Sequence, residues 1–402
     1  MARILVATMP FVSHVNTTAA IVIKLVERGH EVCWYTGRKY QAKVEATGAD
    51  FVPFRSAPDF DDADPAWATA GKAKAKGLAG LKQDIKQGFV ASVPGQVKDL
   101  QEILRHFPAE VTLADMTLAG VGLVHELGGP VWAAYGHIPL TFTSRDTAPF
   151  GMAILPSSSG LGRLRNWLLH SFFSKVLFRD VTEFADQIRQ ELGLSACHKL
   201  TNDQTLSPYL YLQGTVPGFE YFRSDLAPQI HFTGPFLSPT SKIFTPPEWW
   251  SDLNSGRPVV HITQGTVSNK PEELLIPAIK ALADLDVLVV ATTGGRPLES
   301  IKLQNRPANL RLEEFIPHAQ LLPYVDVMVT NAGYGGVQIA LANGVPLVAA
   351  GATEDKPEVA NRIAWSGVGI NLKTGTPRPH QILGAVKKIL TDTTYRQAAE
   401  TS

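Results

Sequence analysis

The sequence predicts an α/β protein with two domains, each built around a parallel β-sheet. The chain has 402 residues, which is the size of two ordinary domains. Short apolar runs alternate with segments of helical periodicity in both halves of the chain. The chain also begins with the order strand, loop, helix, strand, and such a unit joins two parallel strands by a right-handed crossover.

In the N-terminal half, four short apolar runs predict buried strands: Arg3–Thr8, Glu31–Tyr35, Glu110–Ala114 and Val131–Ala134. Helices are predicted at Thr17–Arg28, over most of 71–106, and at Leu118–Leu127. The loop after the first strand contains His14, and Asp115 follows the third strand. Ligands bind at the carboxyl ends of parallel strands, so both are candidate site residues. Alternatively, His14 is a surface or structural residue and Asp115 caps the next helix.

The C-terminal half repeats the pattern, with strands predicted at Pro258–Thr263, Asp286–Ala291, Leu310–Glu313, Asp326–Thr330 and Val345–Ala350. The last two strands enclose a loop with three glycines, Asn331–Gly336, and a short helix, Val337–Ala342. Glycine lets a backbone approach a ligand closely, and N–H groups at a helix N-terminus face anions, so this loop is a candidate phosphate site. The alternative is a turn without a ligand, because the loop matches neither the dinucleotide fingerprint nor a P-loop.

Prolines and aromatic residues are frequent between Leu206 and Pro247, which favours a linker in this part of the chain. We expect an N-terminal domain at 1–225, a linker at 226–247 and a C-terminal domain at 248–402.

The composition argues against several classes of function. The 37 basic and 37 acidic side chains cancel, which argues against a nucleic-acid partner. Cys33 and Cys197 are the only cysteines, and no Cys/His cluster has metal-ligand spacing, so no structural metal is expected. Asp62 and Asp64 lie in a polar loop beside proline, which favours a solvated turn over a metal site. No apolar run is long enough to span a membrane, so we expect a cytoplasmic protein without stable membrane insertion.

Several motifs carry a family resemblance over essentially the whole chain. They are Ser13-His14-Val15-Asn16, Arg28-Gly29-His30, Gly234-Pro235-Phe236, Phe315-Ile316-Pro317-His318, the loop Asn331–Gly336, Gly344-Val345-Pro346 and Asp355-Lys356. Their order and spacing resemble those of the nucleotide-sugar-dependent glycosyltransferases with the GT-B fold, in the macrolide and antibiotic branch of the UDP-glycosyltransferase-like enzymes. The resemblance implies two Rossmann-like domains that face a central cleft, with the acceptor on the N-terminal side and the donor on the C-terminal side.

The resemblance also implies roles for single residues. His14 matches the family's catalytic base, and Asp115 matches the aspartate that holds that base. The donor-binding positions are Gly265, Thr266, Phe315, His318, Asn331, Gly333, Gly335, Gly336, Glu354, Asp355 and Lys356. Candidate acceptor-binding side chains are Phe11, Phe142, Phe172 and Phe173.

Some donor positions depart from the family pattern. Asn331 replaces the family's phosphate-contacting His, and Gly336 replaces its Ser. Phe315 and His318 replace the Trp and Gln that face uracil, and Ile339 replaces the Glu that holds the ribose. These changes leave the donor open, with UDP-glucose expected first and a TDP-sugar next.

The segment Gly162–Arg179 is amphipathic and contains basic but no acidic residues. We rank three interpretations in this order: a helix packed on the core, an apolar wall of the acceptor site, and a helix resting on anionic lipid.

The expected reaction is the transfer of a sugar from a nucleotide-sugar donor to a hydroxyl of a hydrophobic small molecule, with inversion and without a metal or other cofactor. Two alternatives remain. Loss of the loop His, Ser and Glu is compatible with a non-catalytic helper of another glycosyltransferase, and the same fold also supports nucleotide-sugar epimerases.

Overall fold

The computed structural model describes residues 1–62, 77–237, 244–265 and 270–401. The chain forms two compact units. Unit 1 comprises Met1–Pro149, Ser157–Gly214 and Arg223–Ser238. Unit 2 comprises Phe150–Pro156, Thr215–Phe222 and Pro239–Ser402.

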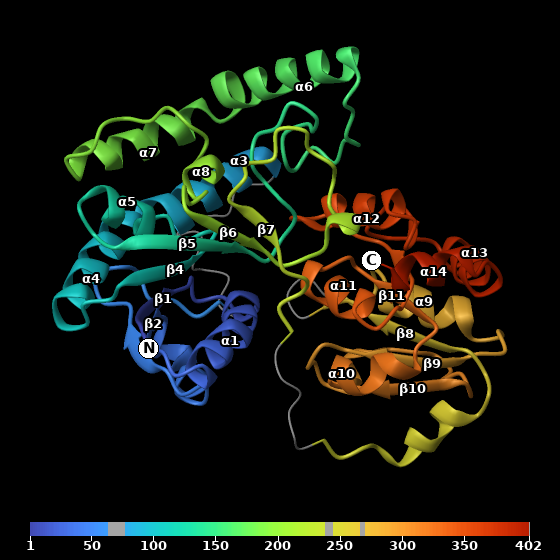
Figure 1. The fold of residues 1–402 in the computed structure, drawn as a ribbon. Helices are drawn as coiled ribbons and strands as arrows, with labels where there is room; N and C mark the ends of the chain where they lie inside the picture. The colour runs from blue at the N-terminus through green and yellow to red at the C-terminus, as the bar shows by residue number, and fades with distance from the viewer. Residues whose placement is uncertain (63–76, 238–243, 266–269, 402) are drawn as a thin grey trace. The chain divides into compact units, whose positions relative to one another are not determined.

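Unit 1 contains a parallel sheet of seven strands in the order β3-β2-β1-β4-β5-β6-β7 (Figure 1). The strands are β1 (Arg3–Ala7), β2 (Glu31–Thr36), β3 (Asp50–Pro53), β4 (Val111–Asp115), β5 (Val131–Gly136), β6 (Leu210–Gln213) and β7 (Ile230–Phe232). The helices are α1 (Val12–Glu27), α2 (Gln41–Glu45), α3 (Gly77–Gln83), α4 (Val93–His106), α5 (Gly120–Glu126), α6 (Gly160–Phe172), α7 (Arg179–Glu191) and α8 (Thr201–Gln204).

Both faces of this sheet are buried, as expected for a sheet with all strands parallel. Alternate residues of β1 face opposite sides: Ile4 and Val6 pack with α1, whereas Leu5 and Ala7 pack with α4 and α5. The apolar run of β1 therefore follows from a strand that is covered on both faces.

Unit 2 contains a second parallel sheet, of six strands in the order β10-β9-β8-β11-β12-β13. The strands are β8 (Val259–Thr263), β9 (Leu288–Thr292), β10 (Leu310–Glu313), β11 (Val327–Thr330), β12 (Leu347–Ala349) and β13 (Gly369–Asn371). The helices are α9 (Leu275–Leu282), α10 (His318–Leu321), α11 (Tyr334–Leu341), α12 (Lys356–Trp365), α13 (Pro379–Thr391) and α14 (Thr394–Glu400). The predicted α/β class with two parallel sheets is confirmed.

The units do not divide the chain at a single point. Residues 150–156 and 215–222 belong to unit 2, although the sequence assigns both segments to the N-terminal domain. Phe219 is buried in the core of unit 2, and the buried guanidinium of Arg362 binds the carboxylate of Glu220 at 2.6 Å. The stretch 226–247, predicted as a linker, includes β7, which pairs with β6.

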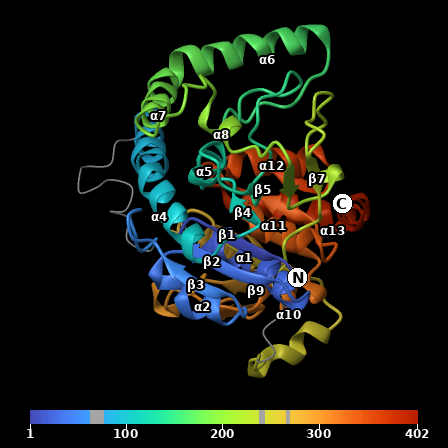
Figure 2. The same ribbon diagram turned by 60° about the vertical axis from the view of Figure 1, so that its left-hand side comes forward.

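Each sheet has a topological switch point, which is the place where the strand order reverses. Ligands of open α/β sheets bind at the carboxyl ends of the strands at this point. In unit 1 it lies between β1 and β4, and in unit 2 between β8 and β11. Figure 2 shows the two sheets from a second direction. Asp115 ends β4, and the segments that follow β1, β8 and β11 contain His14, Gly265 and Asn331.

Candidate active site

His14 lies in the first turn of α1 rather than in a loop, so the predicted loop over Met9–Asn16 is wrong beyond Phe11. The carboxylate of Asp62 accepts a hydrogen bond from Val12 N–H at 2.8 Å, and so satisfies one N–H group at the start of the helix. The distant Asp62 gives no signal in the local sequence pattern, which is why the helix was expected to begin later.

Asp62 itself differs from the expected solvated turn. Its side chain is 9% exposed, and its carboxylate binds the Lys39 ammonium at 2.7 Å and the Tyr40 hydroxyl at 2.7 Å. Asp64 lies outside the described residues. Within the described ranges, no group of three His, Cys, Asp or Glu side chains is arranged to hold a metal ion.

His14 and Asp115 are brought together at the switch point of unit 1. His14 Nδ1 lies 3.2 Å from Asp115 Oδ2, which also accepts a hydrogen bond from Met9 N–H at 2.7 Å. Asp115 Oδ1 accepts from the Thr117 N–H at 2.7 Å and from the Thr117 hydroxyl. Burial raises the pKa of Asp115, but His14 and the hydrogen bonds outweigh burial and lower it to about 2. The carboxylate is therefore ionised beside the imidazole at neutral pH.

A second imidazole, His137, lies beside His14 and was missed in the sequence. It follows β5 directly, and its ring centroid is 4.0 Å from that of His14. Burial and the neighbouring His14 lower the pKa of His137 to about 3, although Asp115 acts in the opposite direction. Its position after a strand predicted at Val131–Ala134 is the same signal that selected Asp115.

Two of the four candidate acceptor residues lie in unit 1 near its core. The ring of Phe11 is 5.0 Å from that of His14, so Phe11 is placed beside the proposed base. Phe142 is only 6% exposed and packs edge-on against Tyr211, with ring centroids 4.9 Å apart. Phe142 is therefore a core residue in this structure, because its ring fills the space over β6.

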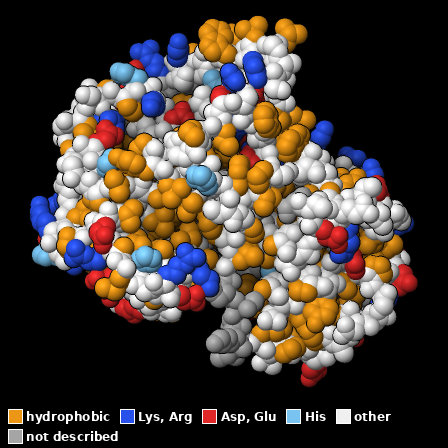
Figure 3. Space-filling view, viewed as in Figure 1, with side chains coloured by type: hydrophobic (Ala, Val, Ile, Leu, Met, Phe, Trp, Pro, Cys, Tyr) orange, Lys and Arg blue, Asp and Glu red, His pale blue; other side chains and the backbone are white. Residues whose placement is uncertain are grey.

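The first-ranked interpretation of Gly162–Arg179, a helix packed on the core, is wrong. The helix α6 and the π-helical segment Phe173–Leu177 present a row of apolar side chains that are each more than half exposed: Leu161, Leu164, Trp167, Leu168, Phe172 and Val176. Figure 3 shows apolar side chains along the upper edge of the molecule, where Figure 1 draws α6. Helical periodicity alone does not tell a face that is buried from one that is exposed.

Phe172 and Phe173 have different surroundings within this segment. Phe172 is 52% exposed, whereas Phe173 stacks on Phe178 with ring centroids 4.3 Å apart. Figures 1 and 2 both draw α6 far from α1 within unit 1. The role of Phe172 and Phe173 in acceptor binding stays a prediction.

In unit 2, the loops after β8 and β11 meet at the switch point. The Asn331 amide donates a hydrogen bond to the backbone carbonyl of Gln264, and its Oδ1 accepts from Gly333 N–H at 3.3 Å. Gly265 lies against the Asn331 side chain and has a φ of +74°, which glycine adopts without strain. Thr266, the next candidate donor residue, lies outside the described residues.

The helix α11 begins at Tyr334, so Gly335 and Gly336 lie in its first turn and not in a loop as predicted. Burial of Val337, Ala340 and Leu341 outweighs the low helix propensity of the two glycines. The first N–H groups of a helix have no acceptor within it. Among the described residues, nothing outside the helix backbone lies within 4 Å of the place that a Cβ on Gly335 would take.

Phe315 and His318 follow β10. Phe315 is 67% exposed, so its ring is free to stack on a planar ligand. Burial lowers the pKa of His318, whose ring meets the buried His261 ring edge-on at 5.5 Å. His318 therefore offers a neutral imidazole at pH 7.

Glu354, Asp355 and Lys356 lie at the start of α12. Lys356 binds Glu354, and Glu354 has a φ of +57°, an uncommon backbone conformation for a residue other than glycine. Burial raises the pKa of Asp355 to about 6, with Lys356 acting in the opposite direction. Asp355 is thus mostly ionised at pH 7.

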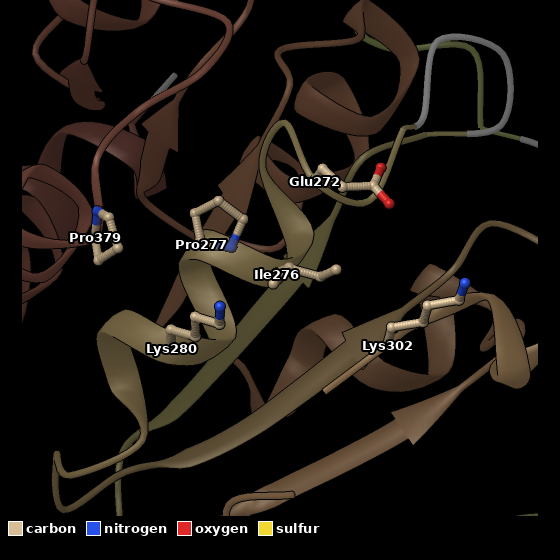
Figure 4. A pocket seen from close by; sticks show the side chains of 6 residues that line it. All are labelled: Glu272, Ile276, Pro277, Lys280, Lys302 and Pro379. Carbon is tan, nitrogen blue, oxygen red and sulfur yellow. The ribbon is translucent and has the colours of Figure 1, made fainter. Parts of the chain in front are cut away.

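Unit 2 also has a shallow pocket of about 400 Å³. Figure 4 shows its lining residues, which are Glu272, Ile276, Pro277, Lys280, Lys302 and Pro379. None of them is a candidate site residue, and we assign no role to this pocket.

Comparisons with known proteins agree on one family. The C-terminal domain of erythromycin biosynthesis protein CIII-like proteins matches residues 277–401. The 4'-demethylrebeccamycin synthase of Lentzea aerocolonigenes is 48% identical over 396 residues, which cover 98% of this chain and 93% of that protein. UDP-glycosyltransferase 2 of Phaeomoniella chlamydospora is 33% identical over 99% of this chain and 90% of its own length.

Solved structures show the same fold. The calicheamicin glycosyltransferase CalG4 matches with a TM-score of 0.74 at 20% identity, over 100% of this chain and 93% of its own. The spinosyn rhamnosyltransferase SpnG, complexed with thymidine diphosphate, matches with a TM-score of 0.67 at 19% identity, over 99% of this chain and 94% of its own. Within the described ranges, none of the helices is long and apolar enough to cross a membrane.

Proposed function

The chain belongs to the GT-B glycosyltransferases of natural-product biosynthesis, and from that premise we propose that it transfers a sugar from a UDP-sugar to a hydroxyl of a hydrophobic small molecule. Glucose is the proposed sugar, and the reaction inverts the anomeric carbon without a metal. The observation that carries the proposal is the His14–Asp115 pair at the switch point of unit 1, with Nδ1 and Oδ2 3.2 Å apart.

His14 is the proposed general base. Its Nδ1–H donates to Asp115, which leaves the Nε2 lone pair to take the proton of the acceptor hydroxyl. Asp115 stays ionised, because its pKa is about 2, and so stabilises the imidazolium that forms. The acceptor oxygen bonds to the anomeric carbon as the bond from that carbon to the diphosphate breaks. The proton goes to His14 and the electron pair leaves with UDP.

The donor is proposed to bind at the switch point of unit 2. The N–H groups of Gly335 and Gly336 lie in the first turn of α11 and have no acceptor within the helix. They are proposed to donate to the diphosphate, because a helix N-terminus favours negative charge. The exposed ring of Phe315 offers a stacking surface for the base. Asp355, partly buried and ionised at neutral pH, accepts hydrogen bonds from sugar hydroxyls.

The choice of UDP rests on relatives and not on the base-facing residues. Several relatives that are 29–33% identical are named as UDP-glycosyltransferases or UDP-glucosyltransferases. Thymidine diphosphate is present in the SpnG structure, which shares only the fold at 19% identity. We therefore propose UDP-glucose first and keep a TDP-sugar as the alternative.

The proposal is tested by incubating the protein with UDP-glucose, with and without EDTA, and with a panel of phenolic and macrolide acceptors. Mass spectrometry should find adducts heavier than the acceptor by one hexose residue, in equal amount with EDTA. Proton NMR should show the β-anomer. A panel without any adduct would favour the helper, and a changed sugar on UDP without any acceptor would favour the epimerase.

A further inference from the structure

His137 has one ring nitrogen that no described residue satisfies. Its Nδ1 is buried and has no hydrogen-bond partner among the described residues. Buried polar side-chain atoms are usually hydrogen-bonded, so an unpaired nitrogen next to the proposed base needs an explanation. The ring lies 4.0 Å from that of His14, centroid to centroid, with the two planes inclined by 59°.

The protonation state of His137 follows from its neighbours. The groups that face it are His14 from α1, Asp115 from β4 and Tyr135 from β5, whose ring centroid is 6.4 Å away. Burial and His14 oppose a charge on His137 more strongly than Asp115 favours one, so the pKa falls to about 3. Burial keeps Tyr135 protonated as well. His137 is thus a neutral imidazole with a single N–H.

Two other histidines of the chain also combine a bare buried nitrogen with a neutral ring. His170 and His261 each have one buried nitrogen without a hydrogen-bond partner in the described part of the chain, and in each the other nitrogen meets a backbone carbonyl at 3.0 Å. A carbonyl only accepts, so in both rings the paired nitrogen carries the proton and the bare nitrogen is the acceptor. A bare acceptor is also less unfavourable than a bare N–H donor. Nδ1 is the bare buried nitrogen of His137, so the lower cost of a bare acceptor favours the tautomer with the proton on Nε2.

We propose that His137 is an acceptor-binding residue whose Nε2–H donates a hydrogen bond to the acceptor oxygen while His14 Nε2 takes the proton from that oxygen. This inference rests on the proposed function and deepens it. The two rings would hold one oxygen between a donor and a base, which fixes its orientation toward the anomeric carbon. The donated hydrogen bond strengthens as negative charge develops on the oxygen.

The arrangement fits hydroxyl acceptors, and phenols in particular. A phenol oxygen can accept from His137 while it donates to His14, and the resulting phenolate keeps the hydrogen bond from His137. Because His137 is neutral, it does not compete with His14 for the proton of the acceptor.

The test uses His137→Phe, which keeps a planar ring but has no N–H, and His137→Gln, which keeps an N–H donor. We expect His137→Phe to lower kcat/KM for the acceptor about 10–100-fold, as for loss of a hydrogen bond to a developing oxyanion. His137→Gln should recover most of that loss. The affinity for UDP should stay within about twofold in both, because the proposed donor residues belong to unit 2.

His170→Phe is the matched control. His170 also has a bare Nδ1, but its Nε2 donates to the carbonyl of Thr147 and not to a ligand. Its replacement should lower the melting temperature without a selective loss of acceptor kcat/KM. The acid limb of the kcat/KM profile should stay at the same pH in His137→Phe, because a neutral donor contributes no titration between pH 5 and 9.

A second readout separates this proposal from the proposed function. Binding of 4-nitrophenol in the presence of UDP, followed by calorimetry and by absorbance, needs no turnover. Weaker binding in His137→Phe than in wild type, with recovery in His137→Gln, supports the assignment even where no sugar is transferred. Equal kcat/KM and equal 4-nitrophenol affinity in all three proteins would overturn it while leaving the glycosyltransferase activity intact. A wild type that neither binds nor glucosylates 4-nitrophenol or any panel hydroxyl would overturn both.

Discussion

At the scale of single residues, the proposed chemistry and the proposed donor binding fall on different units. His14 and Asp115 belong to unit 1, whereas the candidate donor residues belong to unit 2. His14→Ala should therefore lower turnover on an alcohol acceptor by about 10²–10⁴ at neutral pH, because the hydroxyl loses its base. UDP affinity by calorimetry should stay within a few-fold.

Asp115→Asn should lose less activity than His14→Ala, because His14 can still accept a proton in a poorer orientation. Acidic phenols should suffer least from loss of His14, since they ionise more readily. Wild-type turnover of His14→Ala on an aliphatic alcohol would rule out His14 as the base.

Asn331 gives a second residue-scale prediction. One N–H of its amide is used by the Gln264 carbonyl, and we propose that the second N–H donates to the donor diphosphate. Asn331→Ala should weaken UDP binding several-fold, since a neutral hydrogen bond contributes about 1 kcal/mol. Asn331→Asp is the sharper variant, because a carboxylate repels the diphosphate and should weaken UDP binding further. Unchanged UDP affinity in both would remove this loop from the donor site.

At the residue scale, the sequence found His14 and Asp115 but not His137. The position of Asp115 at the end of a strand was visible in the apolar pattern, and the family motif singled out His14. His137 also follows a strand, yet no motif marks it, and its meaning depends on the His14 ring 4.0 Å away. The position after a strand could have marked His137 as a candidate, but its contact with His14 joins residues far apart in sequence and is not visible in a local pattern.

At the scale of elements, the start of α11 makes a prediction that separates helix stability from donor binding. Gly335 is exposed in the first turn, and no described residue outside the helix lies within 4 Å of the place of a Cβ. Gly335→Ala should leave the fold intact and stabilise it by up to about 1 kcal/mol, the helix-propensity difference between the two residues. UDP binding should weaken at least several-fold, because the methyl group would stand where the diphosphate approaches the N–H groups.

Gly384 in α13 is the control for this change. It is also an exposed helix glycine, no described side chain lies within 4 Å of the place of its Cβ, and it is not a candidate site residue. Gly384→Ala should raise the melting temperature and leave UDP affinity unchanged. Equal UDP affinity in both variants would argue against diphosphate binding at α11.

The strands of the two sheets were predicted better than the helix starts. A buried parallel strand is a largely apolar run, which β1 and β11 show most clearly, with Ile4–Ala7 and Val327–Val329. The start of α1 depends instead on the Asp62 carboxylate, which is 50 residues away in sequence from Val12. The short strands β6 and β7 were not predicted as strands, and they lie in the region rich in proline and aromatic residues. Strands of 3–4 residues show too little periodicity to be recognised in the sequence.

At the scale of the whole molecule, the order of residues in the sequence does not predict which segments form unit 2. Residues 150–156 and 215–222 belong to it through contacts made by α12. Glu358 accepts hydrogen bonds from the N–H groups of Gly151 and Ala153, and Arg362 binds both Glu220 and Glu358. A buried ion network of this kind requires all its members in place, and no member is close to the others in sequence except Glu358 and Arg362.

Stability against acid is also a property of the whole molecule, because each unit holds a buried neutral histidine. Burial lowers the pKa of His137 in unit 1 and of His261 in unit 2 to about 3, against an ordinary value of 6.5. Between these pH values the unfolded chain binds a proton at each site and the folded chain does not. The stabilisation is therefore complete above pH 6.5 and is lost as the pH falls toward 3.

Each of these histidines should make the free energy of unfolding fall by about 1.4 kcal/mol per pH unit below pH 6. Urea unfolding at pH 7.0 and pH 5.0, followed by fluorescence, measures this fall. Replacing His261 by leucine removes the titrating group from unit 2 and also the hydrogen bond from its Nδ1–H to the carbonyl of Val290. His261→Leu should thus be less stable than wild type at pH 7.0, yet lose less stability between pH 7.0 and 5.0. The same pH dependence in both proteins would show that His261 does not titrate on unfolding.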